Sequence, residues 1–350
     1  MQKKYIIKKN MECFIMGYIN MNSSDLIKPY NGVELNDEGQ KYKKIGEEVL
    51  KKKKLGVVIL SGGQGTRLGS DAPKGLFKIK GKTLFEWHME TIREIIDKYN
   101  ANITVFIMTS SFTDEAVREY FQKTDFGLKI HFFKQKNSLC VGTDGKPLQY
   151  YEGYAESPYG NGNMFEAIQQ VNLEGIEALN VISIDNVLAK ILDPVFVGAF
   201  FSGNYDIISK SVTKKEKESV GAFQIDGKLR IKEYGENDAD GDGVQGNICN
   251  HMFRTSFVKK MKSVNLPEHK AFKKIPYTID GKLINPVKPN GFKKETFIFD
   301  SFEYAQSNGV MNVPREKEFA PLKNGMDSTV DNPMTCALAV EKHRIKTSMQ

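Results

Sequence analysis

Cysteine is scarce in this chain of 350 residues. The four cysteines, Cys13, Cys140, Cys249 and Cys336, are scattered and form no Cys-x-x-Cys pair. Structural zinc sites and disulfide frameworks need several cysteines at short, regular spacings. The sequence therefore predicts neither. Because this cysteine usage fits a reducing compartment, we expect the protein in the cytoplasm.

Long apolar runs are also absent from the sequence. A membrane-spanning helix needs roughly 18 or more consecutive apolar residues, and no such run occurs. The apolar residues at 13–18 are interrupted by polar ones before they reach the length of a signal-peptide core. We therefore expect no membrane partner.

Charge of one sign is only in small excess. The chain has 50 Lys and Arg residues against 43 Asp and Glu residues, a formal charge of +7. Much of the lysine lies at 41–44 and 51–54, beside a helix-like segment at 45–50, as is typical of a solvated helix face. A nucleic-acid surface is the alternative, but aromatic residues do not alternate with the basic ones over a sustained run. We expect no nucleic-acid partner, because small anionic substrates also account for positive charge.

What the sequence does have is a glycine-rich segment directly after an apolar run. Residues 55–60 are rich in β-branched side chains and too short for a typical helix, so they predict a buried parallel strand. Gly62, Gly63 and Gly65 follow this strand. Since glycine has no Cβ and reaches positive φ at low cost, successive backbone N–H groups there can converge on phosphate oxygens. The segment predicts a cradle for a nucleoside triphosphate.

Two fixed cations belong to the same segment. The Arg67 guanidinium can hold two phosphate oxygens at once. The Lys74 ammonium is a compact charge, suited to a point where negative charge accumulates during a reaction. Pro73 restricts the backbone just before Lys74. The pair therefore favours a catalytic phosphate site over a simple turn.

Two common phosphate motifs do not match these residues. A P-loop needs a lysine directly after its last glycine, and no lysine follows Gly69. The dinucleotide fingerprint Gly-x-Gly-x-x-Gly, counted from Gly63, has Leu68 at its last position. A Walker-type NTPase and a Rossmann dehydrogenase are therefore disfavoured.

Strand-like and helix-like segments alternate along the chain. In the first half we predict strands at 55–60, 103–108, 129–133 and 181–185, and helices at 83–97, 113–121 and 164–170. In the second half we predict strands at 219–223, 229–234, 251–253 and 297–299. This alternation predicts an α/β fold whose parallel or mixed sheet has helices on both faces.

The glycine-rich segment at 62–69 and Pro73-Lys74-Gly75 together resemble the signature of the eukaryotic UDP-N-acetylglucosamine pyrophosphorylases. These enzymes are members of the nucleotide-diphospho-sugar transferase superfamily. Later blocks follow in the family's order, at 132–135, 160–162, 184–186, 233–236, 246–251, 274–277, 288–293, 297–300 and 315–324. The resemblance implies the superfamily's Rossmann-like fold, with a mixed, mainly parallel central sheet flanked by helices.

The resemblance also implies roles for particular residues. The nucleotide would be held by Gly62, Gly63, Gln64, Gly65, Thr66, Gln135 and Gly160. Gln135 follows a predicted strand, and its amide offers the donor and the acceptor that suit the imide edge of uracil. The sugar would be contacted by Asn161, Gly221, Glu233, Tyr234 and Asn247. Catalysis would rest on Arg67, Lys74 and Lys293, and Asp185, a hard oxygen ligand at a strand exit, would bind a metal ion.

Two features depart from the family pattern. Tyr159 stands where relatives usually have aspartate, which leaves the role of this position open. The chain also ends soon after Pro333, whereas longer relatives continue into another domain. We expect an N-terminal extension and helical segment at 1–50, a catalytic domain at 51–335 and a short tail at 336–350, without the family's C-terminal domain. The nucleotide half would span 51–190 and the sugar half 191–335.

The sequence thus predicts an Mg²⁺-dependent uridylyltransferase, with Mn²⁺ as an alternative ion. It would convert UTP and N-acetylglucosamine 1-phosphate into UDP-N-acetylglucosamine and pyrophosphate, acting as a monomer. One alternative keeps the fold and changes the sugar, giving a UDP-glucose or broad-specificity UDP-sugar pyrophosphorylase. The alternative from a different class is a non-catalytic sensor of nucleotide sugars.

Overall fold

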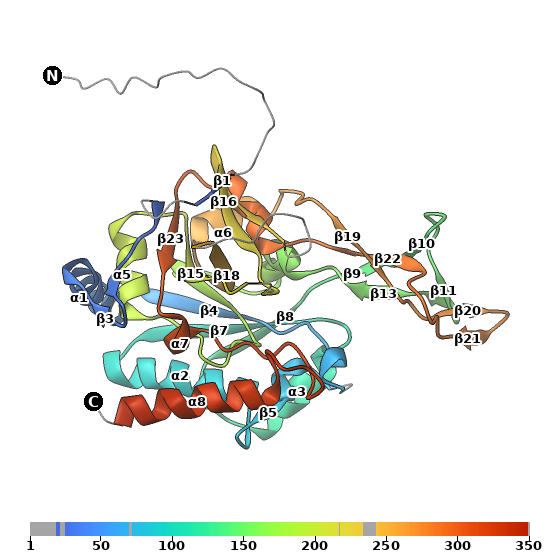
Figure 1. The fold of residues 1–350 in the computed structure, drawn as a ribbon, viewed down its shortest axis with the longest axis horizontal. Coiled ribbons are helices and arrows are strands. Elements are labelled where there is room, and N and C mark those ends of the chain that lie inside the picture. Colours follow the sequence, from blue (N-terminus) through green and yellow to red (C-terminus); the bar gives the residue numbers. More distant parts are fainter. Residues whose placement is uncertain (1–18, 22–24, 70–71, 217, 234–242, 349–350) are drawn as a thin grey trace.

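The protein consists of a body built on one large sheet and an arm that projects from it (Figure 1). The computed structural model describes residues 19–21, 25–69, 72–216, 218–233 and 243–348. None of the helices among these residues combines the length and the apolar composition that crossing a bilayer requires.

The central sheet has ten strands and is mixed. Along its main path the order is β1 (Ile19–Asn20), β16 (Ala222–Asp226), β18 (Gln245–Arg254), β14 (Ala178–Ser183), β4 (Lys54–Leu60), β7 (Asn102–Thr109) and β8 (Ile130–Lys134). Strands β15 (Ile207–Thr213), β17 (Lys228–Lys232) and β23 (Asn308–Asn312) extend it off this path. Strands β14, β4, β7 and β8 pair in parallel, and β18 runs antiparallel to β14. A mixed sheet flanked by helices is therefore confirmed.

Strand β4 is buried on both faces because alternate side chains enter two different cores. Val57 and Ile59 pack into a cluster with residues of helix α2 (Leu84–Tyr99). Val58 and Leu60 pack into a second cluster on the other face. This explains why the strand is an unbroken apolar run, as central parallel strands usually are.

Helices α1 (Asp37–Lys52), α2 and α5 (Pro194–Ser202) begin after a residue whose side chain accepts a backbone N–H of the first turn. Thr83 and Glu86 form a reciprocal capping box at the start of α2, the helix predicted at 83–97. The other helices are α3 (Asp114–Lys123), α4 (Met164–Ala167), α6 (Thr255–Met261), α7 (Arg315–Glu318) and α8 (Pro333–Ser348). Single 3₁₀ turns occur at Thr66–Leu68, Lys74–Leu76, Asn161–Asn163 and Ile168–Gln170.

Helices α1 and α5 cross closely because glycine faces glycine at the crossing. A Cβ added to Gly46 would lie 1.8 Å from the carbonyl oxygen of Pro194. A Cβ added to Gly198 would lie 1.8 Å from the carbonyl oxygen of Tyr42. Neither position has room for a larger side chain while the helices keep this distance.

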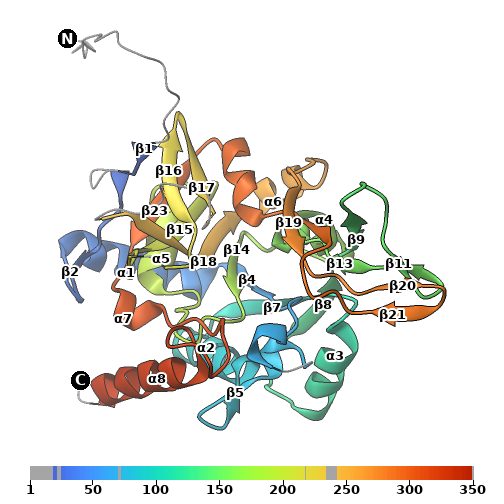
Figure 2. The same cartoon turned by 45° about the vertical axis from the view of Figure 1, so that its right-hand side comes forward.

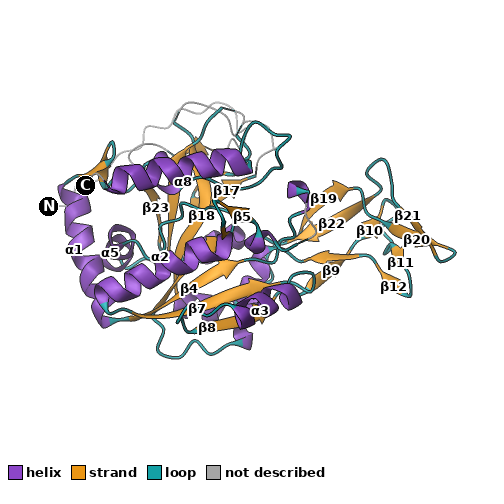
Figure 3. Ribbon diagram, turned by 90° about the horizontal axis from the view of Figure 1, so that it is seen from below, coloured by secondary structure: helices purple, strands orange, loops and turns teal. Residues whose placement is uncertain are grey.

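The segment at 336–350, expected as a short tail, belongs for most of its length to helix α8. Asn332 caps this helix by accepting a hydrogen bond from the Thr335 N–H at 2.8 Å. Cys336 and Val340 are buried in the core that contains α2, and α8 lies beside α2 in Figures 1 and 3. The segment therefore packs on the body.

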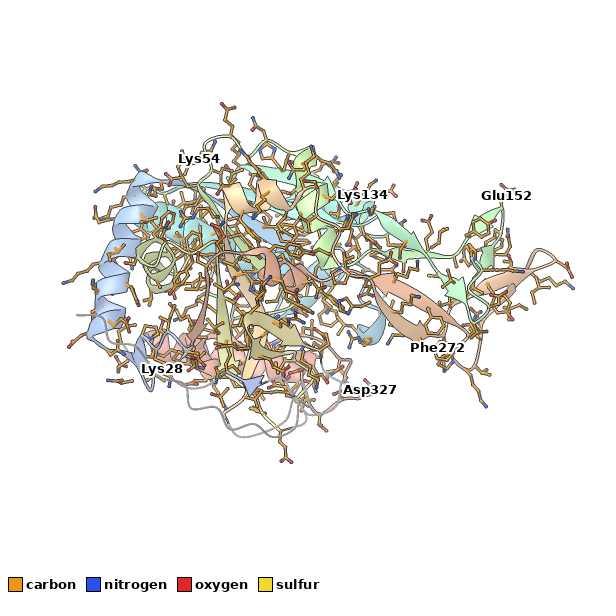
Figure 4. The ribbon with its side chains drawn as sticks, turned by 90° about the horizontal axis from the view of Figure 1, so that it is seen from above. Lys28, Lys54, Lys134, Glu152, Phe272 and Asp327 are labelled. Atoms are coloured by element: carbon orange, nitrogen blue, oxygen red, sulfur yellow. The ribbon has the colours of Figure 1, made fainter. Side chains whose placement is uncertain are left out.

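The arm is made of short strands from two distant parts of the chain, as Figures 1 and 2 show. They are β9 (Asn137–Leu139), β10 (Val141–Gly142), β11 (Gln149–Tyr150), β12 (Gly153–Tyr154), β13 (Glu156–Pro158), β19 (His269–Lys273), β20 (Tyr277–Ile279), β21 (Lys282–Ile284) and β22 (Gly291–Glu295). Its own apolar core is small and consists of Cys140, Ala155 and Ile275 with the partly buried Leu148. Figure 4 places Glu152 at the distal end.

Two smaller hairpins complete the fold: β2 (Tyr30–Asn31) with β3 (Glu34–Leu35), and β5 (Lys78–Ile79) with β6 (Lys82–Thr83). Most predicted strands are present, with ends shifted by a few residues. The strand predicted at 297–299 is wrong, because Ile298–Tyr304 forms a 3₁₀ helix. There the carbonyl of Ile298 accepts the Ser301 hydroxyl at 2.6 Å, a local bond that an extended strand could not make.

Candidate active site

The glycine-rich loop leaves β4 at the carboxyl end of the parallel strands and folds back on the segment before Lys74. The Gly65 N–H donates to the carbonyl of Ala72 at 3.2 Å, and the Lys74 N–H donates to the carbonyl of Gly63 at 3.3 Å. Gln64 and Pro73 form an isolated bridge between the same stretches. The loop therefore folds back so that Lys74 lies next to Gly63, near the end of β4.

Buried hydroxyls support the loop from behind. The Ser110 hydroxyl donates to the carbonyl of Gly62 at 2.8 Å, and the Thr113 hydroxyl donates to the carbonyl of Ser61 at 3.4 Å. The Ser110 N–H donates in turn to the Thr113 hydroxyl at 3.0 Å. These bonds occupy loop carbonyls on the protein side, which fixes the backbone that would face a ligand.

Gln135 lies directly against the loop. Its N–H donates to the carbonyl of Thr109 at 3.0 Å, and its side-chain amide is so close to Gly62 that a Cβ there would lie 1.8 Å from Nε2. The side chain is buried, and within the described part of the chain its Oε1 accepts no hydrogen bond. A buried acceptor without a donor costs free energy, so this oxygen is ready for a ligand donor.

Lys74 meets Asp185 where β4 and β14 end side by side. The Lys74 Nζ lies 3.4 Å from Oδ2 of Asp185, and both side chains are mostly buried. Burial alone would raise the pKa of Asp185, but the nearby charges of Lys74 and Lys323 outweigh burial and lower it. The carboxylate is therefore ionised at neutral pH and able to bind a cation.

His88 fixes the chain just before Asp185. Its Nε2 lies 3.0 Å from the carbonyl oxygen of Ile184. Burial lowers the pKa of His88 to about 4, so the ring is neutral at pH 7. Because a carbonyl can only accept, Nε2 is the protonated nitrogen and donates to it.

A cavity of about 260 Å³ opens between these strand ends and the base of the arm. Seven of the predicted site residues line it: Gly62, Gly63, Lys74, Gln135, Gly160, Asn161 and Lys293. They come from segments as far apart in sequence as β4 and β22, which supports one shared site.

Strand β22 extends from the arm into this cavity, so its alternate residues have different surroundings. Lys293 and Glu295 line the cavity. Lys294, between them, forms an ion pair with Glu268 at 3.2 Å. The alternation along a strand thus distinguishes the two adjacent lysines and assigns the cavity to Lys293.

The turn at Gly160 and Asn161 is pressed against the segment after β22. Gly160 has a φ of 91°, and a Cβ there would lie 2.4 Å from the carbonyl oxygen of Thr296. The Asn161 Oδ1 accepts the Ile298 N–H at 2.9 Å. The sugar contact predicted for Asn161 therefore falls to its amide NH₂ group.

The predicted sugar residues form a second group. The Asn247 N–H donates to the carbonyl of Gly221 at 2.8 Å, and a Cβ on Gly221 would lie 3.2 Å from Oε1 of Glu233. Cys249 connects this group to Asp185: burial, followed by the charges of Asp185 and Glu233, raises the pKa of its thiol to about 12. Tyr234 lies outside the described residues.

Arg67 and its neighbours lie at the rim. Gln64, Thr66 and Arg67 are exposed, and Gly65 is buried. The charge of Arg67 acts on Glu295, where burial raises the carboxyl pKa and the surrounding cations partly offset that rise. Arg67 is thus close enough for its charge to act on Glu295, but unlike Lys74 it does not line the cavity.

Tyr159, at the position that departs from the family pattern, points away from this cavity. Its hydroxyl donates to Oε1 of Glu268 at 2.7 Å, and Lys136 Nζ lies 4.9 Å from its ring centre. It lines a separate hollow of about 560 Å³ behind the Gly160 turn. Tyr159 therefore supports the turn from the outside.

One cation near Asp185 was not predicted. Lys323 lowers the pKa of Asp185, and its Nζ donates to the carbonyl of Ser219 at 2.7 Å. The preceding residue, Leu322, donates its N–H to the carbonyl of Asp185 at 2.9 Å. The motif at 315–324 contained this lysine, but no local spacing indicates that it returns to the end of β14.

Comparisons with known proteins identify the family of the chain. The family model described as UTP--glucose-1-phosphate uridylyltransferase matches residues 2–349. The chain belongs to this family. A relative in this uridylyltransferase family, the Encephalitozoon cuniculi protein named "Probable UDP-N-acetylglucosamine pyrophosphorylase", is 82% identical over 335 residues, which span 96% of this chain and 100% of that protein.

More distant relatives within the uridylyltransferase family cover less of their own length. The Saccharomyces cerevisiae UDP-N-acetylglucosamine pyrophosphorylase is 36% identical over 86% of this chain and 71% of that protein. The crystal structure of the Trypanosoma brucei uridine diphosphate N-acetylglucosamine pyrophosphorylase, solved with an inhibitor, superposes with a TM-score of 0.79 at 26% identity. That superposition covers 92% of this chain and 72% of the other.

Proposed function

We propose that this protein is the uridylyltransferase that forms UDP-N-acetylglucosamine and pyrophosphate from UTP and N-acetylglucosamine 1-phosphate. The observation that carries the proposal is the cavity that the glycine-rich loop and Lys74 line, together with the ion pair between Lys74 and Asp185. It occurs in a chain that is 82% identical to the Encephalitozoon cuniculi relative.

The proposed chemistry is an in-line displacement on the α-phosphorus of UTP. An oxygen of the sugar phosphate forms the new bond to phosphorus, and the bond from phosphorus to the bridging oxygen breaks, so that pyrophosphate leaves with the electron pair. No covalent enzyme intermediate is needed. The protein has to hold two anions together and neutralise developing charge, which favours a site rich in fixed cations and backbone donors.

The residues divide these tasks by position. The loop at Gly62 and Gly63 would bind phosphate oxygens, and Lys74 would act at the base of the cavity where charge develops. Lys293 faces the same cavity from the arm. Arg67 at the rim would hold the outer phosphates, and Lys323 would add charge on the Asp185 side.

Base and sugar selection are assigned to separate groups. The Gln135 Oε1, which is buried and accepts no hydrogen bond from the described residues, would accept the imide N–H of uracil. Glu233 and Asn247 would bind sugar hydroxyls, with Asn161 donating from its NH₂ group. Gly221 lets Ile231 and Glu233 pack against its backbone, because a Cβ there would lie 2.6 Å from Ile231 Cγ2 and 3.2 Å from Glu233 Oε1.

Asp185 fits a Mg²⁺ ion that the nucleotide brings with it. Among the described residues no group of three or more His, Cys, Asp or Glu side chains could form an all-protein metal cage. Mg²⁺ is usually held by one or two carboxylates together with substrate phosphates, and Asp185 supplies an ionised carboxylate. When bound, the ion would neutralise phosphate charge, and Mn²⁺ could replace it.

A substrate panel tests this proposal. Pyrophosphate release would be measured with UTP and N-acetylglucosamine 1-phosphate, N-acetylgalactosamine 1-phosphate or glucose 1-phosphate, with and without Mg²⁺. We expect the fastest turnover with N-acetylglucosamine 1-phosphate and none without the ion. Glucose 1-phosphate as the best substrate would establish the UDP-glucose alternative, and no turnover with any sugar would establish a non-catalytic sensor. We further propose that the enzyme is a monomer, which sedimentation at working concentration tests. We also propose that it acts in the cytoplasm, which cell fractionation tests.

A further inference from the structure

A buried ion cluster lies next to the site, outside the residues assigned to substrate. Lys210 of β15 is fully buried, and its Nζ lies 2.5 Å from Oε2 of Glu318 and 3.2 Å from Oδ2 of Asp193. Glu318 is the last residue of α7, and Asp193 caps the start of α5. Three separate elements therefore meet at one ammonium group.

The charges in this cluster depend on one another. Burial alone would lower the pKa of Lys210, but Glu318 and Asp193 outweigh burial and raise it, so the lysine stays protonated. Without Lys210, Glu318 and Asp193 would be two buried carboxylates that disfavour each other's charge. Such pairs hold their elements in place chiefly because a broken pair leaves an uncompensated charge.

Glu318 also begins the segment that ends at Lys323. The Asn186 Nδ2 donates to the carbonyl of Glu318 at 2.8 Å, and the Asn186 Oδ1 accepts the Ala320 N–H at 2.9 Å. The Leu322 N–H then donates to the carbonyl of Asp185 at 2.9 Å. The segment 318–322 is thus aligned with the chain that leaves β14.

This alignment places the backbone of Lys323, whose N–H also donates to the carbonyl of Asp331 at 2.8 Å and whose Nζ donates to the carbonyl of Ser219 at 2.7 Å. Lys323 follows Leu322 directly, and its charge acts on Asp185 and on Cys249. A displacement of the segment at Glu318 would move Lys323 away from Asp185. Misplacing a charged group by about 1 Å can lower a rate about 100-fold.

We propose that the buried cluster of Lys210, Asp193 and Glu318 is a positioning device for the active site: it fixes the segment 318–323 so that Lys323 lies beside Asp185. The proposal rests on the proposed function, in which Lys323 contributes charge to the phosphate site. The three cluster residues touch no substrate and act through Lys323. Asn186 is part of this device, because it links the segment 318–320 to the chain that leaves β14.

A double-mutant cycle separates positioning from general stabilisation. We would measure kcat and KM for Glu318→Gln, Lys323→Ala and the double variant. Glu318→Gln should lower kcat about 10- to 100-fold in the wild-type background and less than about twofold in the Lys323→Ala background. The KM for UTP should change little, because the loop and Gln135 are untouched. An equal loss of kcat in both backgrounds, or no loss in a folded Glu318→Gln protein, overturns the proposal.

Two further variants keep the test decisive. If Glu318→Gln does not fold, Asp193→Asn is used in the same cycle, since asparagine retains an acceptor for the Val195 N–H. There we expect about a threefold loss of kcat that disappears with Lys323→Ala, and an undiminished loss overturns the proposal. Val258→Ala, a core change in α6 away from this segment, is the matched control for lost stability, and its kcat should stay at the wild-type value.

Lys74→Ala distinguishes failure of this inference from failure of the proposed function. If Lys74→Ala and Lys323→Ala both turn over at the wild-type rate, the proposed site itself is wrong. If Lys74→Ala is inactive and Lys323→Ala is unchanged, the site stands and only the positioning role is overturned.

Discussion

The two walls of the active-site cavity are built in different ways. One wall consists of the ends of β4, β7 and β14, which are central strands with large cores on both faces, and of the edge strand β8 beside them. The other comes from β13 and β22, which extend into an arm whose core is a few side chains around Ile275. The rigid wall supplies the phosphate loop, Lys74, Asp185 and Gln135, and the arm supplies Lys293. More of the predicted site residues therefore lie on the better-packed wall than on the arm.

Among the substitutions considered, removing Lys74 should have the largest effect on kcat. A small effect would contradict the view that the better-packed wall provides the main charge for the reaction. Lys74→Ala should lower kcat about 100- to 1,000-fold, because it removes a preorganised charge at the base of the cavity. Its melting temperature should stay close to that of the wild type, because the charge of Lys323 still acts on the Asp185 carboxylate when Lys74 is removed. Pyrophosphate release and a thermal melt measure both effects. A fully active variant would remove Lys74 from the mechanism.

Acid should weaken the rigid wall through His88. Its pKa is about 4 in the fold and 6.5 when unfolded, so between these values the unfolded chain binds the additional proton. The free energy of unfolding should therefore be undiminished by this group above pH 6.5 and fall as the pH drops toward 4. The loss approaches about 3 kcal/mol, taking about 1.4 kcal/mol for each pKa unit.

Urea unfolding at pH 7 and pH 5 measures this loss. His88→Gln keeps an amide donor for the Ile184 carbonyl and removes the titration, so its unfolding free energy should depend less on pH. His251, on β18 in the antiparallel part of the sheet, also has a pKa lowered by burial, to about 3. The pH dependence that remains in His88→Gln is therefore assigned to His251. A wild-type protein equally stable at both pH values would contradict the neutral, buried state of His88.

Gln135 should affect binding rather than turnover. Gln135→Ala removes the proposed acceptor for uracil and should raise the KM for UTP about 10-fold, equivalent to about 1.4 kcal/mol. The preference for UTP over CTP should shrink with it. Steady-state kinetics with both nucleotides test this. Gln64→Ala, at the exposed rim, is the control and should keep that preference.

The smallest effect on overall stability is expected in the arm. Ile275→Ala should leave the global unfolding free energy within about 0.5 kcal/mol of the wild type, because the arm can open locally without the sheet. Ile107→Ala in β7, by contrast, should cost about 2–5 kcal/mol. Hydrogen exchange should be faster in β19 and β22 of the arm variant only. A large global loss for Ile275→Ala would show that the two walls unfold together.

The sequence could predict the central strands of the sheet better than the segments that pack against them. Residues 55–60 and 103–108 are recognisable as strands because both of their faces are buried. Strand ends place Gln135 and Asp185 at the edge of the sheet where ligands bind, and the resemblance implies their roles. The strand predicted at 297–299 failed because Phe297-Ile-Phe is apolar in either state, and the local Ser301 bond decides for a 3₁₀ helix.

The partnership of Lys323 with Asp185 could not be predicted, because it depends on how the chain returns after β23. The cluster around Lys210 could not be predicted either, because the sequence around Lys210 in β15 does not indicate that Asp193 and Glu318 pack against it. The helical nature of 333–348 was missed because its apolar residues do not form the regular stripe of an amphipathic helix. Its start is set instead by the Asn332 cap and by contacts of Cys336 with the carbonyls of Ala320 and Pro321.

The glycine-on-glycine crossing of α1 and α5 has a consequence for how the protein can evolve. Because each helix touches the other's backbone at Gly46 and Gly198, a mutation to alanine at one site is not repaired by any change at the second. Drift at these codons is tolerated only if the whole pair of helices separates, which would also displace Asp193 at the start of α5. We therefore expect each of the two positions to remain glycine independently of the other.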